Sequence, residues 1–116
     1  MVFRFEELDI WKLAMEYANE LYDIAEKFPS HEMYALGSQL RRAAVSIPTN
    51  IAEGSGAVTT KDFCNYLDVS VKSGLETVSL MYFAAQKKYV KEEIRQSCYN
   101  KVELLIKKTR AFKKSL

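Results

Sequence analysis

Apolar residues recur at three- and four-residue steps through four long stretches of this 116-residue chain. This spacing places the apolar side chains along one side of an α-helix. The stretches cover residues 7–28, 31–53, 60–88 and 91–113, with short breaks between them. No stretch alternates apolar and polar residues as a half-buried strand does. The pattern predicts an all-α fold, an antiparallel up-down four-helix bundle that forms a single domain over residues 1–116.

Each predicted helix has an apolar stripe that we expect to face the core. In chain order the four stripes are Leu8, Trp11, Met15, Ala18, Tyr22 and Ala25; Leu36, Leu40, Ala44, Ile47 and Ile51; Phe63, Leu67, Val71, Leu75, Val78 and Tyr82; and Ile94, Cys98, Val102, Leu105, Thr109 and Phe112. The first helix also has a second apolar set, which predicts neighbours on two of its sides: Ile10, Leu13, Tyr17, Leu21 and Ile24.

The breaks contain residues that end and begin helices. Pro29 cannot continue the hydrogen-bond ladder of the first helix. Ser30 is the expected N-cap of the second helix, and Thr59, with Asp62 three residues later, predicts a capping box for the third. Gly54 is suited to the left-handed position that closes the second helix.

Two residues inside predicted helices have special conformational demands. Pro48 removes one backbone hydrogen bond and crowds the carbonyl of Ala44, which predicts a kink in the second helix. Gly74 lowers helix propensity by about 1 kcal/mol, so close packing is the expected reason for its small size.

The net charge of +2 is unevenly distributed. Residues 1–60 carry five Lys or Arg against nine Asp or Glu, whereas residues 61–116 carry twelve against six. This asymmetry suits either an external partner or contact between the acidic part of one copy and the basic part of another.

No stretch is apolar for the roughly 20 residues of a membrane span, so no membrane partner is expected. The two cysteines have no metal or disulfide pattern, and a reducing cytoplasm is the expected location.

Five cations gather near the end of the fourth helix, with no acid among them. Clustered charge of this kind predicts contact with phosphates of RNA or DNA. The other interpretation is a solvated surface whose cations interact favourably with the helix C-terminus, and for the cluster taken alone it is the favoured one. The residues are Lys107, Lys108, Arg110, Lys113 and Lys114, of which Lys107, Arg110 and Lys114 are predicted to face outward.

A polar stripe on the second helix allows two interpretations. It is either a contact surface for another subunit or a nucleic acid, or a structural feature that compensates for Pro48, with Arg42 paired to Glu53. The structural or assembly interpretation is favoured. The stripe comprises Gln39, Arg42, Ser46, Thr49, Asn50 and Glu53.

The sequence offers little for an enzyme. The single histidine, His31, cannot supply the two Glu-x-x-His motifs of a di-metal bundle. Neither Cys64 nor Cys98 has a local activating motif, so both are expected to be buried thiols. Gly54-Ser55-Gly56 lacks the lysine of a phosphate-binding loop. We therefore expect neither catalysis, nor a cofactor, nor a metal.

Residues 38–54, SQLRRAAVSIPTNIAEG, resemble the signature of the four-helix-bundle proteins encoded in intervening sequences of bacterial large-subunit (23S) ribosomal RNA genes. The resemblance extends to residues 8–14, LDIWKLA, and to Phe28-Pro29. Residues 73–77, SGLET, depart from the more usual Gly-Ser-x-x-Glu-Leu. The resemblance implies a homo-oligomeric ring, typically a pentamer. It also implies a likeness in fold to the accessory proteins of diversity-generating retroelements, which associate with a reverse transcriptase and nucleic acid.

Together these features predict a non-enzymatic oligomeric bundle that binds nucleic acid, with RNA favoured, through the basic surface of the fourth helix. The alternative is a protein-interaction scaffold or accessory subunit that docks an acidic partner, of which a reverse transcriptase is one case.

Overall fold

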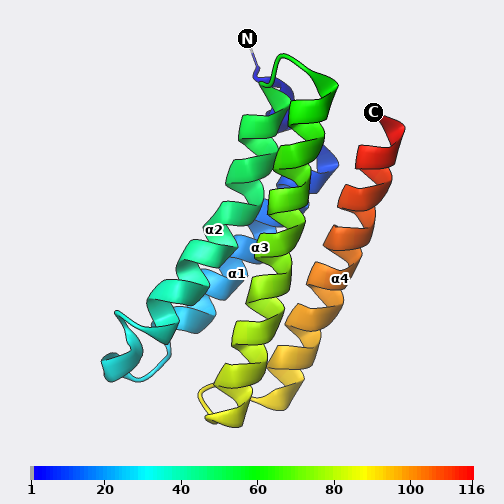
Figure 1. Cartoon of the computed structure of the whole chain (residues 1–116). Helices are drawn as coiled ribbons and strands as arrows, with labels where there is room; N and C mark the ends of the chain where they lie inside the picture. Colours follow the sequence, from blue (N-terminus) through cyan, green and yellow to red (C-terminus); the bar gives the residue numbers. More distant parts are fainter. Residues whose placement is uncertain (1) are drawn as a thin grey trace.

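Four antiparallel helices run the length of the molecule, and successive helices alternate in direction (Figure 1). The structure is a computed structural model that describes residues 2–116. The helices are α1 (Asp9–Glu26), α2 (Leu36–Ser55), α3 (Thr60–Gln86) and α4 (Glu92–Ser115), with the 3-10 helices η1 (Arg4–Glu7) and η2 (Ser30–Glu32) before α1 and α2. The chain ends and the α2–α3 connection lie at one end of the bundle, and the other two connections lie at the opposite end. The predicted four-helix bundle is confirmed. Over residues 2–116 no helix is long and apolar enough to span a membrane.

The core draws large apolar side chains from all four helices. Burying each of them contributes about 1.5–3 kcal/mol. The fully buried ones include Leu21, Leu40, Ile47, Ile51, Leu67, Met81 and Val102.

Polar groups that enter this core are paired. Tyr17 and Thr77 join α1 to α3 through a hydrogen bond of 2.9 Å between their oxygens, and the Ser70 hydroxyl donates to the carbonyl of Ile47. Burial is the main reason why the pKa of Tyr17 is raised, so its hydroxyl remains protonated. These bonds fix how the helices align, because an unpaired polar group in the core is costly.

The predicted stripe of α1 is only partly correct. Met15 and Tyr22 are 38% and 40% exposed, whereas the second apolar set supplies Tyr17 and Leu21 to the core. Both sets have helical spacing, so periodicity alone does not show which of them faces inward.

The stripe predicted for α3 is correct up to Val71 and wrong at Leu75 and Tyr82, which are 50% and 45% exposed. Gly74 and Thr77 face inward instead. A Cβ on Gly74 would lie 3.3 Å from Cγ2 of Val102. The small residue therefore allows α3 to approach α4 closely, as the sequence predicted.

The ends of α2 differ from those predicted. Ser30 begins η2 and is not the N-cap of α2, whose N-cap position is Ala35. Gly54 lies within the helix and not in a left-handed position, and Gly56 is the C-cap with φ −92°. The role of Gly54 is to let α2 approach α3, because a Cβ there would lie 2.6 Å from Cβ of Tyr66.

The first half of the capping box predicted for α3 is present, because the backbone N–H of Asp62 donates to the hydroxyl oxygen of Thr59 at 3.1 Å. The return bond to the Asp62 carboxylate is not among the hydrogen bonds of residues 2–116. Pro48 is buried and lies inside α2, which is helical on both sides of it. The kink at Pro48 stays a prediction.

Candidate nucleic-acid interface

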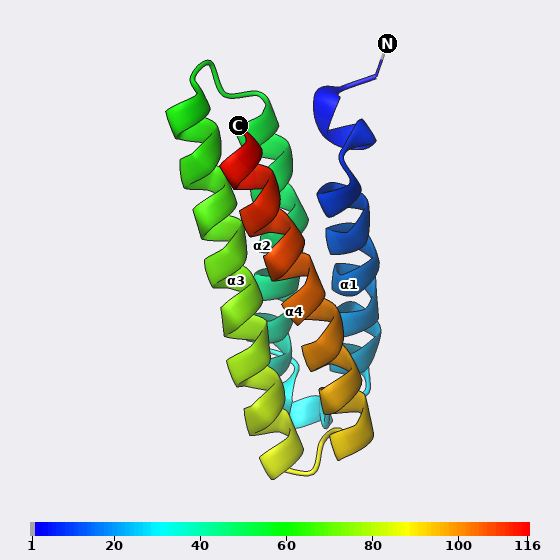
Figure 2. The same ribbon diagram turned by 90° about the vertical axis from the view of Figure 1, so that its right-hand side faces the viewer.

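The basic cluster of α4 lies on the outer surface of the bundle, toward the C-terminus of the chain. Figure 2 shows α4 in front, with its outer side uncovered by another helix. Lys107, Arg110 and Lys114 recur at three- and four-residue steps on this outer side and are exposed, as expected. We call these three residues the α4 triad. Lys108 is also exposed.

Lys113, the fifth cation, faces α3. Its Nζ lies 2.8 Å and 3.1 Å from the two carboxylate oxygens of Asp68. This hydrogen bond raises the pKa of Lys113. The sequence cluster therefore divides into a triad available to a ligand, a flanking Lys108 and a lysine already paired within the chain.

The polar stripe of α2 divides in the same way. Ser46 shares a hydrogen bond of 2.8 Å with Ser73 of α3, and the Asn50 amide donates to the hydroxyl and the carbonyl of Ser46. Ser46 therefore joins α2 to α3, and Asn50 holds Ser46 from within α2. The other members, Gln39, Arg42, Thr49 and Glu53, are exposed.

The predicted pairing of Arg42 with Glu53 is not among the ion pairs of residues 2–116. The exposed members of the stripe are therefore open to a second subunit or a ligand.

An apolar groove runs along the outside of α1 and α2, and we call it the α1–α2 groove. Its volume is about 450 Å³. Trp11 packs against Phe5 with ring centroids 5.0 Å apart. Met15 and Tyr22, which were predicted to lie in the core, line this groove together with Val45 and Pro48. A groove of this kind is typical of a protein–protein contact.

Sequence reasoning missed a buried arginine at the start of α4. Arg95 is 5% exposed, and its guanidinium donates to both carboxylate oxygens of Glu92 at 2.6–2.9 Å. Its Cζ also lies 4.2 Å from the ring centroid of Tyr82. The hydrogen bonds from Arg95 lower the pKa of Glu92. The i,i+3 spacing of Glu92 and Arg95 on a helix could have predicted the ion pair. The contact between Arg95 and Tyr82 could not be predicted, because Tyr82 comes from a different helix.

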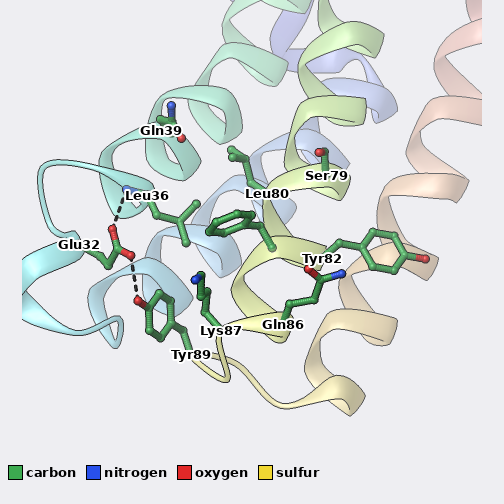
Figure 3. Close-up of a pocket in the computed structure, with 10 residues that line it drawn as sticks. Glu32, Leu36, Gln39, Ser79, Leu80, Tyr82, Gln86, Lys87 and Tyr89 are labelled. Atoms are coloured by element: carbon green, nitrogen blue, oxygen red, sulfur yellow. Dashed lines mark hydrogen bonds between the residues drawn. The ribbon is translucent and has the colours of Figure 1, made fainter.

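An open cavity lies near the α3–α4 connection, and we call it the end cavity (Figure 3). Its volume is about 620 Å³. Glu32 borders it and accepts a hydrogen bond of 2.9 Å from the hydroxyl of Tyr89. The ring of Tyr89 packs on Phe28 with ring centroids 5.8 Å apart. The exposed side chains of the cavity include Gln39, Phe83, Gln86 and Lys87.

The two cysteines differ in their surroundings. Cys98 is 1% exposed, and burial, with a smaller contribution from Glu20, raises its pKa to about 11. Cys64 is only partly buried. The expectation of a buried thiol is therefore correct for Cys98 and too strong for Cys64.

The single histidine, His31, lies at the surface, where its Nε2 is 3.3 Å from the hydroxyl of Tyr89.

The chain resembles known proteins in both sequence and fold. Residues 6–111 match the family described as 23S rRNA-intervening sequence protein. A crystal structure of a protein of unknown function from the S23 ribosomal protein family of Bacteroides thetaiotaomicron superimposes with a TM-score of 0.80. The two share 22% sequence identity over 90% of this chain and 98% of that chain, a level at which the likeness shows the fold. No curated protein matches the chain.

Proposed function

We propose that this chain, which belongs to the 23S rRNA-intervening sequence protein family, is a non-enzymatic homo-oligomeric bundle that binds RNA through the outer surface of α4. The observation that carries the proposal is the α4 triad: three exposed cations on one rigid helix, uncovered by the rest of the bundle. We place this activity in the cytoplasm, which the free thiols favour.

Phosphate contact is the chemistry that this surface supports best. A row of Lys and Arg side chains neutralises phosphates and releases counterions, independently of base sequence. Arg110 adds a planar fork of donors that matches a phosphate in two-point contact. We expect slight sequence preference at this surface, because phosphate contacts carry no sequence information directly.

Assembly would strengthen this binding. The α1–α2 groove offers apolar surface to a second copy, and the acidic first half of the chain complements the basic second half. A ring, with a pentamer as the expected form, repeats the α4 triad in every subunit. Contacts that are weak singly then combine through high effective concentration.

The test is a charge reversal with a matched control. Lys107→Glu, Arg110→Glu and Lys114→Glu together should abolish RNA binding at low salt while circular dichroism and oligomer mass stay unchanged. The control reverses three exposed lysines elsewhere, Lys12, Lys27 and Lys61, and changes the net charge equally. Equal losses in both variants would assign binding to net charge and contradict a site on α4.

The second candidate is a scaffold that docks an acidic protein, with a reverse transcriptase as one such partner. The exposed α1–α2 groove favours it if this surface remains open after assembly. Absence of RNA binding by the intact protein, together with a groove that stays accessible in the oligomer, would support the scaffold over the RNA-binding function.

A further inference from the structure

We propose that the end cavity binds one unpaired RNA base together with its phosphate. This inference rests on the proposed RNA binding but concerns a different surface. The cavity lies near the α3–α4 connection, whereas the α4 triad lies toward the C-terminus at the other end of a molecule 43 Å long. A strand that occupied both would therefore run along the bundle.

Phe83 supplies a stacking surface in this cavity. Its side chain is 49% exposed, and Lys87 Nζ lies 5.6 Å from the ring centroid. The two neighbouring tyrosines lie against buried side chains, Tyr82 against Arg95 and Tyr89 against Phe28. Lys87, which lies over Phe83, is exposed, so a base can displace it from the ring. Nucleic-acid bases stack on aromatic rings of this kind whatever their sequence.

Polar groups around Phe83 match the rest of a nucleotide. The Gln39 and Gln86 amides line the cavity and carry both donors and acceptors for a base edge. Lys87 is the cation that would meet the phosphate. Glu32 is held at the border of the cavity, because one of its oxygens accepts from Tyr89 and the other lies 3.5 Å from the backbone N of Leu36. Its negative charge repels a phosphate, so the phosphate would lie on the side of Lys87.

The ligand must be unpaired because a base in a duplex is stacked on both faces and cannot reach a protein ring. The volume of about 620 Å³ falls within the range of small-ligand sites. The end cavity and the α4 triad thus have different chemistry: one takes an exposed base, and the other takes phosphates of any strand.

The test crosses a change in the protein with a change in the RNA. Affinities are measured by fluorescence anisotropy for a short single-stranded oligoadenylate and for the same backbone with abasic riboses. Phe83→Ala should weaken binding of the oligoadenylate by about 5- to 100-fold and leave binding of the abasic strand unchanged. Phe83→Trp should restore binding to the oligoadenylate. Leu75→Ala, at an equally exposed apolar position of α3 outside the cavity, is the matched control and should have no effect.

The outcomes separate this inference from the proposed function. Equal weakening of both strands by Phe83→Ala, or no weakening, overturns base binding in the cavity while RNA binding through α4 stands. A changed oligomer mass in Phe83→Ala would make the cavity a subunit contact, which also overturns the inference. If the wild-type protein binds neither strand, the proposed function fails, and the inference that rests on it fails too.

Discussion

The left-handed backbone conformation that the sequence predicted for Gly54, near the end of α2, occurs instead at Lys88, just after α3. The φ of Lys88 is 62°. The N–H of Lys88 donates to the carbonyl of Ala85, and the N–H of Tyr89 donates to the carbonyl of Ala84. This is the hydrogen-bond pattern of a Schellman motif, in which glycine is the usual residue at the left-handed position.

Lys88→Gly should therefore stabilise the protein. A side chain in the left-handed region costs on the order of 1 kcal/mol, and glycine removes that cost. We expect the free energy of unfolding in urea to rise by a similar amount. Lys87→Gly is the control: Lys87 has φ −79°, so the same change there should give no gain. An unchanged stability for Lys88→Gly would show that this backbone conformation is not strained.

Because the Cys98 thiol is buried, we expect the free energy of unfolding to fall at high pH. Its pKa rises from 9.0 to about 11 on folding. Below pH 9 the thiol is protonated in both states; between pH 9 and 11 the unfolded thiol ionises while the folded one does not, so the free energy of unfolding falls. The total fall amounts to about 2–3 kcal/mol. Denaturant titrations from pH 8 to 11 should show a steeper fall for the wild type than for Cys98→Ala, and parallel curves would contradict the burial of an un-ionised thiol.

At the scale of the helices, the sequence predicted how many there are and where each runs, because hydrophobic periodicity reports both directly. It predicted less well which way each helix faces. Met15 and Leu75 have the spacing of core residues but lie at the surface. On α1 the core is filled by Tyr17, and on α3 Gly74 faces inward and allows close approach to α4.

The outward triad of α4 followed from the helical spacing of its cations. The end cavity and the position of Tyr82 beneath Arg95 did not, because both depend on residues brought together from separate elements.

Gly54 tests the contact between α2 and α3. Gly54→Ala would place a Cβ 2.6 Å from Cβ of Tyr66 and 3.0 Å from Cδ1 of Phe63. Overpacking of this kind costs about 1–3 kcal/mol, which outweighs the gain in helix propensity. At Gly56 the corresponding Cβ would lie 3.6 Å from the nearest atom, so Gly56→Ala is the matched control. Thermal unfolding should show a lower midpoint for Gly54→Ala alone, and equal midpoints would contradict this helix contact.

Pro48 links the shape of α2 to assembly, because it is buried within the helix and lines the α1–α2 groove. Pro48→Ala restores a backbone donor and removes the ring that crowds the preceding turn. We expect helicity to be retained while the oligomer weakens. Light scattering at micromolar concentration should give a multimeric mass for the wild type and a lower mass for the variant. A monomeric wild type would contradict assembly, and an unchanged mass in the variant would remove Pro48 from the subunit contact.

At the scale of the whole molecule, acidic and basic residues are separated along the chain. The first sixty residues carry the acidic excess and the rest the basic excess. The three cations of the α4 triad have no acidic partner among residues 2–116. If this surface binds RNA by neutralising phosphates, affinity must fall with salt in proportion to the number of phosphates contacted.

The salt dependence of RNA binding by the wild-type protein tests phosphate binding by the α4 triad most directly. The logarithm of the association constant, measured by anisotropy against the logarithm of salt concentration, should fall on a line with a slope of about −2 to −3.6 for contact with the three or four phosphates that the α4 triad and Lys108 neutralise. The Lys107, Arg110 and Lys114 charge-reversal variant should show no measurable binding across the same series. A slope near zero, or the same slope in the variant, would contradict phosphate binding by the α4 triad.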